Sequence, residues 1–522
     1  MQSAALLLLL AASPCVGGRN DLYYNSSLPA PQQHFKFLFL LPTLEHSHTW
    51  AVAPLAVALA RRGHEVSMLC EDPNIFDFPN VTCIYHNVKL QELKPLKYGE
   101  ESNFITETLE ALNMLDKIAD QMFSSKSLQE LYRRRKEFDL IVIEDFAMIV
   151  LHPFLKEMPY ALYSTISLSQ YQSAQLGNVL NPTYVVEGWS FNFPDFYSLF
   201  NRFKNIIWNT LMYLHFSLRL YCASKTVEAH ISDSIPLAEI ERNASVHFIN
   251  TILALDGPMP LLPNQIPIGG IVLRPHSELP EEVANFLAGE EPVVYVSFGI
   301  STLTDGNISP KNKKILFSVF SDLPYKVIVK IAKQKSRKID NVLYVDSVPQ
   351  QTILAHPRVK AYVSHCGLGG TVEAIHNGVP MVGLPGLLDQ VRTARLLENH
   401  GVAILLSWDT LTEHKLKSSI LEVIHNPSYR RKMEAMSRVF RDQLVSPLDT
   451  AVYWTEYTAR HKGAPHLQSP AKNMSYVQLF ALDVLALILL GAFIVYFVVK
   501  KTFAALFQYT SKNQLIVKQK RL

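Results

Sequence analysis

Apolar and polar positions alternate along the chain with two different periods, and this alternation predicts strands and helices in turn. The continuous apolar run FKFLFLLP at 35–42 predicts a strand buried on both faces. After the loop TLEHSH, residues 50–61 place apolar side chains on one helical face, and HEVSMLC at 64–70 predicts the next strand. These segments form a βαβ unit. A similar strand, FDLIVIED at 138–145, ends in two carboxylates.

A second half repeats the pattern after a proline-rich stretch, 257–267, which we interpret as a linker. Strands are predicted at EPVVYVSFG (291–299), YKVIVKI, NVLYV and VKAYVSH (359–365), with helical patterns between them. The helical period of 427–460 predicts a segment that packs back on the body. The fold class is therefore α/β, with two doubly wound, Rossmann-like domains that face each other.

Both ends of the chain carry apolar segments of another kind. Residues 4–12 (AALLLLLAA) are too short to span a bilayer and indicate a signal peptide, which we place at 1–18. Residues 477–499 are almost wholly apolar and long enough to cross the hydrocarbon, so we predict a single transmembrane helix there. The predicted organisation is completed by an N-terminal domain at 19–258, a C-terminal domain at 259–470 and a tail at 500–522.

Charge and glycosylation motifs predict the orientation of this helix. The tail carries lysines and one arginine but no acid, which marks the cytosolic side of a membrane. All N-x-[ST] acceptors precede the span: Asn25, Asn80, Asn243, Asn307 and Asn473. The terminal KQKRL resembles a dilysine retrieval signal, with a generic basic tail as the alternative. We therefore predict a single-pass type I glycoprotein of the endoplasmic reticulum membrane with its domains in the lumen.

Composition mainly excludes function classes. The 522 residues suffice for two or three domains. The net charge of +3, without a basic face interleaved with aromatic residues, excludes nucleic acid as a partner. Five scattered cysteines fit neither a zinc cage nor a dense disulfide framework, although one bridge could form.

One stretch concentrates the candidate chemistry: SHCGLGGTVEAIHNGVPMVGLPGLLDQ at 364–390. A strand leads into a glycine turn and a helix, and ligands of open α/β sheets bind at this carboxyl edge. The N–H groups of the first helical turn attract a diphosphate, and His365 can add a donor. Glu373 is placed to accept from ribose hydroxyls, and Asp389 and Gln390 can bind sugar hydroxyls. The stretch therefore predicts a site for a nucleotide-sugar.

Residues 34–500 resemble a UDP-glycosyltransferase of the UDP-glucuronosyltransferase family. The resemblance rests on VPQQTILAHP (348–357), the string HxGxxGxxEAIxxGVPMVGLP with its closing Asp-Gln, and NPTYV, RGHEV and LDV elsewhere. It implies a GT-B fold and an inverting transfer from a UDP-sugar to a small lipophilic acceptor, as in detoxification. It also implies that no metal or other cofactor is needed, which agrees with the lack of a D-x-D triplet in the sequence.

The resemblance further implies residue roles. The acceptor-side base corresponds to His48 rather than His46, and a carboxylate would orient it as the base takes the hydroxyl proton. The family pattern favours Glu144 as this carboxylate, while charge placement alone leaves Asp145 open. On the donor side, motif and resemblance together give a UDP-sugar-binding set: Ser301, Gln350, His365, Gly367, Gly369, Gly370, Thr371, Glu373, Asp389 and Gln390.

The sequence departs from the family at donor-side positions. Ser347 stands where the family has a Trp that stacks on uracil, a contact worth roughly 1–3 kcal/mol. Ile300 replaces a phosphate-binding Ser, with Ser301 one step later, and Gly369 replaces an Asn. We interpret Arg392, in an altered DQPxN continuation, as a solvated helix charge, with contact to an acidic sugar as the alternative.

These departures keep a second function open, namely a catalytically weak family member that binds ligands or regulates partner transferases in the membrane of the endoplasmic reticulum. A lipid-specific transferase would differ only in its acceptor. Both glucose and glucuronic acid stay open as the transferred sugar. The family resemblance implies homo- or hetero-oligomers.

Overall fold

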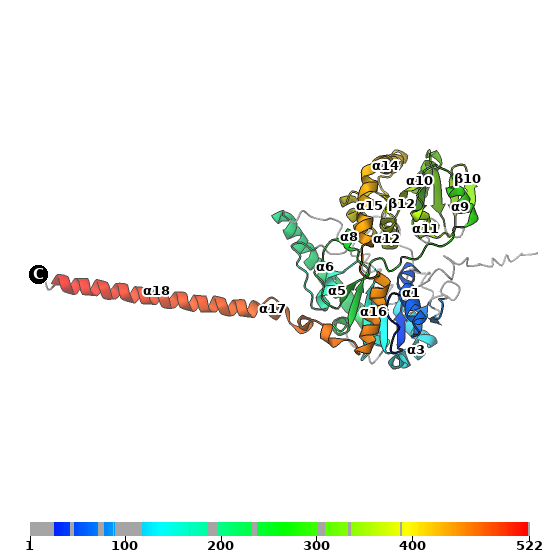
Figure 1. Cartoon of the computed structure of the whole chain (residues 1–522). Helices are drawn as coiled ribbons and strands as arrows, with labels where there is room; N and C mark the ends of the chain where they lie inside the picture. Colours follow the sequence, from blue (N-terminus) through cyan, green and yellow to red (C-terminus); the bar gives the residue numbers. More distant parts are fainter. Residues whose placement is uncertain are drawn as a thin grey trace, which may run out of the picture. The chain divides into compact units, whose positions relative to one another are not determined.

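The computed structural model describes residues 26–41, 46–70, 78–86, 88, 117–165, 167–185, 197–231, 237–299, 308–331, 336–386 and 389–519. Figure 1 shows the whole chain. The chain forms two compact units, Met1–Gln468 and Ser469–Leu522. The first unit contains two seven-stranded sheets, and the second contains the long apolar helix.

The first sheet has the strand order β3-β2-β1-β4-β5-β6-β7, with all of its pairings parallel. The strands predicted at 35–42, 64–70 and 138–145 are confirmed in it. Its strands are β1 Lys36–Leu40, β2 Glu65–Cys70, β3 Thr82–Tyr85, β4 Leu140–Glu144, β5 Tyr160–Ser164, β6 Val246–Ile249 and β7 Gln265–Pro267.

Alternation along β1 shows why this sheet is covered on both faces. Phe37 and Phe39 belong to one buried cluster, whereas Leu38 and Leu40 belong to another on the opposite face. Successive side chains of a strand point to opposite faces, so a continuous apolar run requires helices on both sides. The helices of this half are α1 His46–Arg61, α3 Lys126–Arg133, α4 Asp145–Leu151, α5 Gln170–Gln175, α6 Leu199–Glu228, α7 Leu237–Glu241 and α8 Leu253–Asp256.

The second sheet has the order β10-β11-β9-β8-β12-β13-β14 and is parallel except for the β10–β11 pair. Its strands are β8 Val293–Ser297, β9 Lys326–Lys330, β10 Arg337–Ile339, β11 Val342–Val345, β12 Val359–Ser364, β13 Met381–Gly383 and β14 Ala403–Leu405. The helices of this half are α9 Glu281–Leu287, α10 Pro310–Asp322, α11 Gln350–Ala355, α12 Leu368–His376, α13 Asp389–Asn399, α14 Glu413–His425 and α15 Pro427–Arg441. The two doubly wound sheets confirm the predicted fold class.

The proline-rich stretch 257–267 is not a linker throughout, and our interpretation is wrong for its last residues. Gln265–Pro267 form β7, which pairs with β6 at the edge of the first sheet. An edge strand needs few N–H donors, so it tolerates a proline. The chain leaves this sheet at Gly269, where an added Cβ would lie 2.0 Å from the carbonyl oxygen of Thr251. Only glycine permits this close backbone approach.

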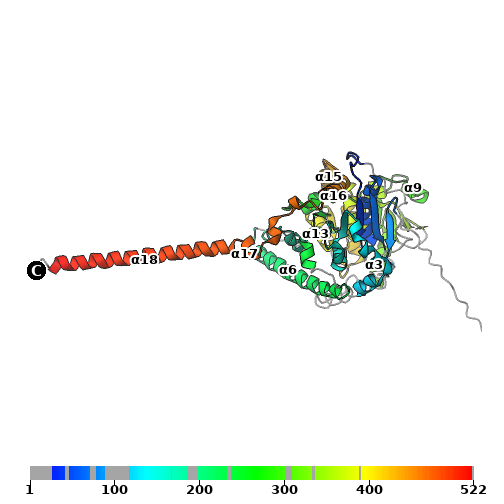
Figure 2. The ribbon, with the colours of Figure 1, turned by 90° about the horizontal axis from the view of Figure 1, so that it is seen from below.

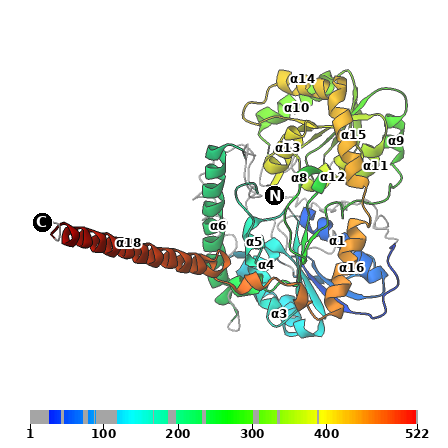
Figure 3. The ribbon, with the colours of Figure 1, turned by 60° about the vertical axis from the view of Figure 1, so that its left-hand side comes forward.

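The predicted return segment at 427–460 is confirmed as two helices. After α15, helix α16 (Pro447–Arg460) packs against α1 of the first half, as Figure 3 shows. Its side chains Ala451, Val452 and Ala459 enter the cluster on one face of the first sheet. The second half of the fold thus ends by completing the core of the first.

A buried charged cluster fastens α16 to the turn between α1 and β2. Arg62 Nε donates to Glu456 Oε1 at 2.6 Å, and His64 Nε2 lies 3.0 Å from the same oxygen. The backbone N–H of Phe35 donates to His64 Nδ1, so the neutral ring carries its proton on Nε2 and donates it to the carboxylate. The RGHE motif therefore has a structural role in this fold.

The second unit contains the apolar segment. The sequence placed the start of the span at residue 477, but the structure has a short helix α17 (Tyr476–Leu479) before α18 begins at Leu482. Within α18 (Leu482–Gln519), residues Leu482–Asn513 are long and apolar enough to cross a membrane. Among the described sequons, Asn80, Asn243 and Asn473 are exposed.

Replacing Glu456 with alanine should lower the stability of the first unit by about 3 kcal/mol, because a buried guanidinium would lose its partner. Thermal unfolding of the detergent-solubilised chain measures this. The matched control is Asp322→Ala, which removes the exposed partner of Lys417 and should change stability by less than about 1 kcal/mol. Equal losses of stability in the two variants would contradict a stabilising role of the buried charged cluster around Glu456.

Candidate active site

The acceptor-side residues meet where two neighbouring strands of the first sheet end. β1 and β4 pair in parallel, so the segments that follow them leave the same edge of the sheet. α1 begins at His46, which places His48 in the first helical turn and not in a preceding loop as the sequence suggested. Glu144 is the last residue of β4 and the N-cap of α4.

His48 and Glu144 are in direct contact. His48 Nδ1 lies 2.9 Å from Glu144 Oε1, and Thr165 Oγ1 lies 3.2 Å from the same nitrogen. Thr165 also donates to Glu144 Oε1 at 3.1 Å, and the backbone N–H of Ala147 donates to Oε2 at 2.9 Å. A carboxylate only accepts, so the His48 proton lies on Nδ1 and the lone pair of the neutral ring lies on Nε2.

The two adjacent carboxyls have opposite pKa shifts. Burial raises the pKa of Glu144, but the hydrogen bond and charge of His48 oppose it and hold this pKa below its usual value. Burial and the neighbouring charge of Glu144 raise the pKa of Asp145 well above its usual value. Asp145 therefore stays protonated and hydrogen-bonds Glu144, which is the carboxylate in contact with His48.

The sequence did not reveal the next layer of this network. Asp145 hydrogen-bonds Ser164, whose Oγ lies 2.8 Å from His247 Nε2. Burial lowers the pKa of His247 to about 3, so its ring is neutral. Ser164 ends β5 and Thr165 follows it, and β5 is the parallel neighbour of β4. The only sequence signal for Ser164 and Thr165 was their position at the end of a strand, β5, whose carboxyl end lies beside that of β4.

The donor-side turn joins β12 to α12. Cys366 has φ 61° in this turn, a conformation that is uncommon for residues other than glycine. An added Cβ at Gly367 would lie 2.5 Å from His365 Nε2, and one at Gly370 would lie 2.8 Å from the Tyr362 hydroxyl. At Gly369 an added Cβ would meet nothing within 4 Å. Two of the three glycines are therefore explained by contacts within the protein, and Gly369 faces open space.

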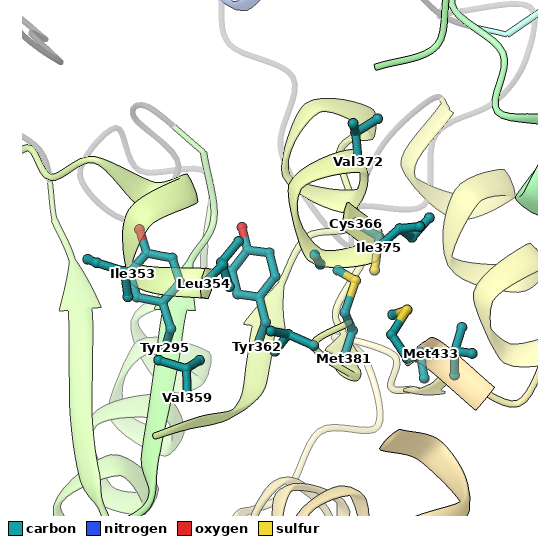
Figure 4. Packing of buried hydrophobic residues seen from close by; sticks show 14 of the residues in the cluster. Tyr295, Ile353, Leu354, Val359, Tyr362, Cys366, Val372, Ile375, Met381 and Met433 are labelled. Carbon is teal, nitrogen blue, oxygen red and sulfur yellow. The ribbon is translucent and has the colours of Figure 1, made fainter. Parts of the chain in front are cut away.

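Behind the turn lies a hydrogen-bonded chain of polar side chains. The Tyr295 hydroxyl donates to Gln350 Oε1 at 3.1 Å, and Gln350 Nε2 donates to Glu373. The Tyr295 ring stacks on Tyr362 with centroids 5.4 Å apart, and Figure 4 shows the two rings side by side in the packed core. Burial raises the pKa of Glu373. The structure thus brings together Gln350 and Glu373, which the sequence placed in one site.

His365 and Thr371 are two polar side chains that the sequence placed in the donor site, and the structure gives them different environments. Burial lowers the pKa of His365 to about 4, although a hydrogen bond to the Ser297 carbonyl opposes the shift. Thr371 is buried in the first turns of α12, and its hydroxyl has no hydrogen-bond partner in the described part of the chain. An orphan buried hydroxyl next to helix N–H groups is an arrangement that a phosphate oxygen would satisfy.

The remaining donor-side candidates lie at the start of α13. Asp389 is its first residue, and Gln390 Oε1 accepts from the backbone N–H of Gly386 at 3.0 Å, which orients the amide. Ser301 and Ile300 lie outside the described residues. Ser347 is described and precedes α11.

Arg274 connects the two halves of the site. Its guanidinium lies 5.3 Å from the ring of Trp50, which is two residues from His48 in α1. Its backbone N–H donates to Gln351 Oε1 at 2.9 Å. Its positive charge opposes the rise that burial causes in the pKa of Glu373. The acceptor-side helix and the donor-side residues are therefore neighbours, bridged by one arginine.

Arg392 does not act as the solvated helix charge that we inferred from the sequence. It is buried, and its Nη1 donates to Asp256 Oδ1 at 2.7 Å. Asp256 belongs to α8 in the other half and accepts from Thr251 Oγ1 and the N–H of Ile252 through Oδ2. This buried pair fastens the two halves beside the site.

No group of three or more His, Cys, Asp or Glu side chains is arranged to hold a metal ion within the described ranges. The metal-free reaction stays a prediction. The described thiols are unbridged, with Cys70 Sγ and Cys83 Sγ 2.8 Å apart on neighbouring strands.

Solved structures with the same architecture are glycosyltransferases of GT-B fold. The calicheamicin glycosyltransferase CalG4 aligns with a TM-score of 0.56 and 16% identity, over 82% of this chain and 99% of that chain. The glycosyltransferase VinC, solved with dTDP, aligns with a TM-score of 0.55 and 18% identity, over 82% of this chain and all of that chain. At this identity the likeness defines the fold, which is GT-B.

Sequence comparison defines the family. The family model described as "UDP-glucoronosyl and UDP-glucosyl transferase" matches residues 38–516, so the chain belongs to this family and is a UDP-glycosyltransferase. UDP-glycosyltransferase UGT5 of Dactylopius coccus is 31% identical over 87% of this chain and 89% of that protein. The 2-hydroxyacylsphingosine 1-beta-galactosyltransferase of Homo sapiens is 29% identical over 88% of this chain and 87% of that protein. UDP-glucuronosyltransferase 2B33 of Macaca mulatta is 28% identical over 88% of this chain and 90% of that protein.

Asp145→Asn should stabilise the protein by an amount that grows from pH 5 to pH 8. The raised pKa of Asp145 means that the folded state keeps a proton that the unfolded state releases above its lower pKa. Wild-type stability therefore falls by up to about 1.4 kcal/mol per pH unit until the folded pKa is passed, whereas asparagine carries no such proton. Thermal midpoints of both proteins at the two pH values test this.

Proposed function

We propose that this UDP-glycosyltransferase transfers a hexosyl or hexuronosyl group from a UDP-sugar to a hydroxyl of a small lipophilic acceptor, with inversion. The contact between His48 Nδ1 and Glu144 Oε1 carries the proposal, since it joins a histidine to a buried carboxylate at the edge where α/β sheets bind ligands. Family membership supplies the UDP-sugar.

His48 acts as the general base in this mechanism. With its proton on Nδ1, the ring takes the acceptor hydroxyl proton at Nε2 as the oxygen attacks the anomeric carbon. Glu144 stabilises the imidazolium that forms, because its carboxylate is already held ionised by three donors. The new glycosidic bond forms on the face opposite to the departing UDP, which inverts the configuration.

The donor side stabilises the leaving diphosphate. The N–H groups at the start of α12 and the hydroxyl of Thr371 provide donors for phosphate oxygens. His365 stays in the proposed donor-binding set on the motif and the resemblance alone. Such preorganised donors typically contribute about 3 kcal/mol each to transition-state stabilisation. Glu373, held by Gln350, accepts from ribose hydroxyls, and Asp389 and Gln390 bind the sugar. Ser301 stays in the proposed donor set on the resemblance alone.

The identity of the sugar stays open among glucose, galactose and glucuronic acid. The relatives include a galactosyltransferase and glucuronosyltransferases. Arg392 gives no reason to favour an acidic sugar, since its guanidinium is buried against Asp256. A matrix of UDP-sugars and phenolic, steroid and lipid acceptors, with UDP release as the readout, decides donor and acceptor together.

We also propose a single-pass type I protein of the endoplasmic reticulum membrane with lumenal catalytic domains and oligomeric partners of its own family. The candidate membrane helix in Leu482–Asn513 supports membrane association. The signal segment at 1–18 and the terminal residues 520–522 lie outside the described residues. A ligand-binding or regulatory member with weak catalysis is the alternative, favoured by Ser347 at the position of the stacking Trp.

His48→Ala should reduce transfer by about 100- to 10,000-fold while UDP binding is retained, because only the base is removed. Glu144→Gln should cause a comparable loss, and Asp145→Asn should retain most of the activity. UDP release and UDP binding by calorimetry give the two readouts. Activity retained in His48→Ala, or lost equally with UDP affinity, would refute the base assignment.

Two alanine substitutions in the turn separate ligand contact from packing. Gly369→Ala should keep the thermal midpoint of the wild type but weaken UDP binding, because the added methyl points into open space where the diphosphate would approach. Gly370→Ala should lower the thermal midpoint, because its methyl would collide with the Tyr362 hydroxyl. If Gly369→Ala bound UDP as the wild type does, the diphosphate would not lie at this turn.

A further inference from the structure

Helix α6 carries an apolar stripe that the described part of the chain leaves exposed. Six side chains spaced by three or four residues along one face are between 45% and 65% exposed: Phe200, Phe203, Ile207, Leu211, Leu214 and Leu218. Residues at this spacing share one face of a helix. Figures 2 and 3 show α6 as a long helix at the outside of the first unit. A contiguous apolar stripe of this length marks an interaction surface.

The opposite face of the same helix is already used by the fold. Asn205, Asn209, Met212, Ala223 and Val227 follow the same spacing half a turn away and are buried. Asn205 Nδ2 donates to the carbonyl oxygens of Pro182 and Val185 at 2.6 and 2.9 Å, which fixes the helix on the body. The apolar stripe therefore points away from the body, and a rotation of the helix that buried the stripe would expose this face.

The charges of α6 indicate what covers the stripe. The helix contains four cations and one acid, Glu228, in its last position. Arg202 and Lys204 lie near the start of the stripe, with Lys204 Nζ 4.2 Å from the ring of Phe200. An amphipathic helix with Phe and Leu on one face and Lys or Arg beside it lies in the interface of a bilayer that contains anionic lipids.

A second copy of the chain would fit these charges poorly. Two α6 stripes paired in either direction would bring cations together with few acids to neutralise them. A bilayer is also within reach, because residues 469–481, between the first unit and α18, extend at most about 45 Å.

We propose that the apolar stripe of α6 docks on the surface of the anionic bilayer that α18 crosses. The consequence for the reaction rests on the proposed function. The other face of α6 packs on α4 and α5, and Tyr171 of α5 contacts Tyr213 of α6 with ring centroids 5.3 Å apart. Both of those helices follow the strand ends that carry Glu144 and Thr165. Docking would place the acceptor side near the lipid in which a lipophilic acceptor dissolves.

Brominated lipids test the contact directly. The full-length chain is placed in nanodiscs of phosphatidylcholine and phosphatidylserine, with and without bromine on the acyl chains. Leu211→Trp adds a fluorophore to the stripe, and Val439→Trp adds one at an exposed site of α15 as the matched control. After subtraction of wild-type emission, bromine should quench most of the added emission of Leu211→Trp and leave that of Val439→Trp unchanged.

Two outcomes would overturn the proposal. Equal quenching in both variants, or none in either, would show that the stripe has no specific lipid contact. If bromine did not quench the added emission of Leu211→Trp, and this emission changed when a nanodisc held two chains instead of one, the stripe would contact a second copy of the chain. Unchanged thermal midpoints confirm that both variants are folded.

A second readout separates this proposal from the proposed function. Replacing Phe203 and Leu218 with serine should raise KM several-fold for a membrane-partitioned acceptor but not for a water-soluble one, with UDP binding unchanged. Equal KM changes for both acceptors would contradict a membrane role in acceptor delivery. If the wild type shows no transfer at all, the proposed function fails, and the brominated-lipid measurement still decides the docking.

Discussion

A single buried carboxylate organises the acceptor half of this molecule. Glu144 is 0% exposed, and burial alone would keep its proton on. Its negative charge is held by three donors that follow different strands, namely the His48 ring after β1, the N–H of Ala147 after β4 and the hydroxyl of Thr165 after β5. Glu144 is also the N-cap of α4. Because helix N-termini favour negative charge, the backbone contributes to the ionisation that the histidine needs.

Other buried charges hold the two halves together without entering the chemistry. Asp256 and Arg392 join α8 to α13, and Glu456 joins the return helix to Arg62 and His64. Each carboxylate has two or more donors, which offsets the cost of its burial. Arg274 completes the arrangement by touching both Trp50 and Gln351. The position of His48 relative to the turn between β12 and α12 is thus set by ion pairs and hydrogen bonds outside the reacting groups.

Strong patterns were predictable, and partners from distant segments were not. Continuous apolar runs such as 35–42 and 359–365 identified strands, and the glycine turn followed from the residues between strand and helix. The hydrogen bonds of Thr165 and His247 escaped prediction because strand order, not sequence, brings Thr165 to Glu144 and His247 to Ser164. Arg392 was misjudged because its partner lies 136 residues away. β7 was missed because prolines near an edge strand resemble a linker.

Helix α6 shows a further limit of periodic patterns. A helix that is apolar on one face predicts a single buried side, but α6 has apolar side chains on two opposite faces, and composition alone does not say which face is covered by protein. Asn205 decides this, because a buried amide requires partners, and its Nδ2 donates to the carbonyl oxygens of Pro182 and Val185 in the body. The exposed face is the one that the proposal assigns to an anionic bilayer, and for an enzyme proposed to act on lipophilic acceptors this contact would bring docking and acceptor supply to the same surface.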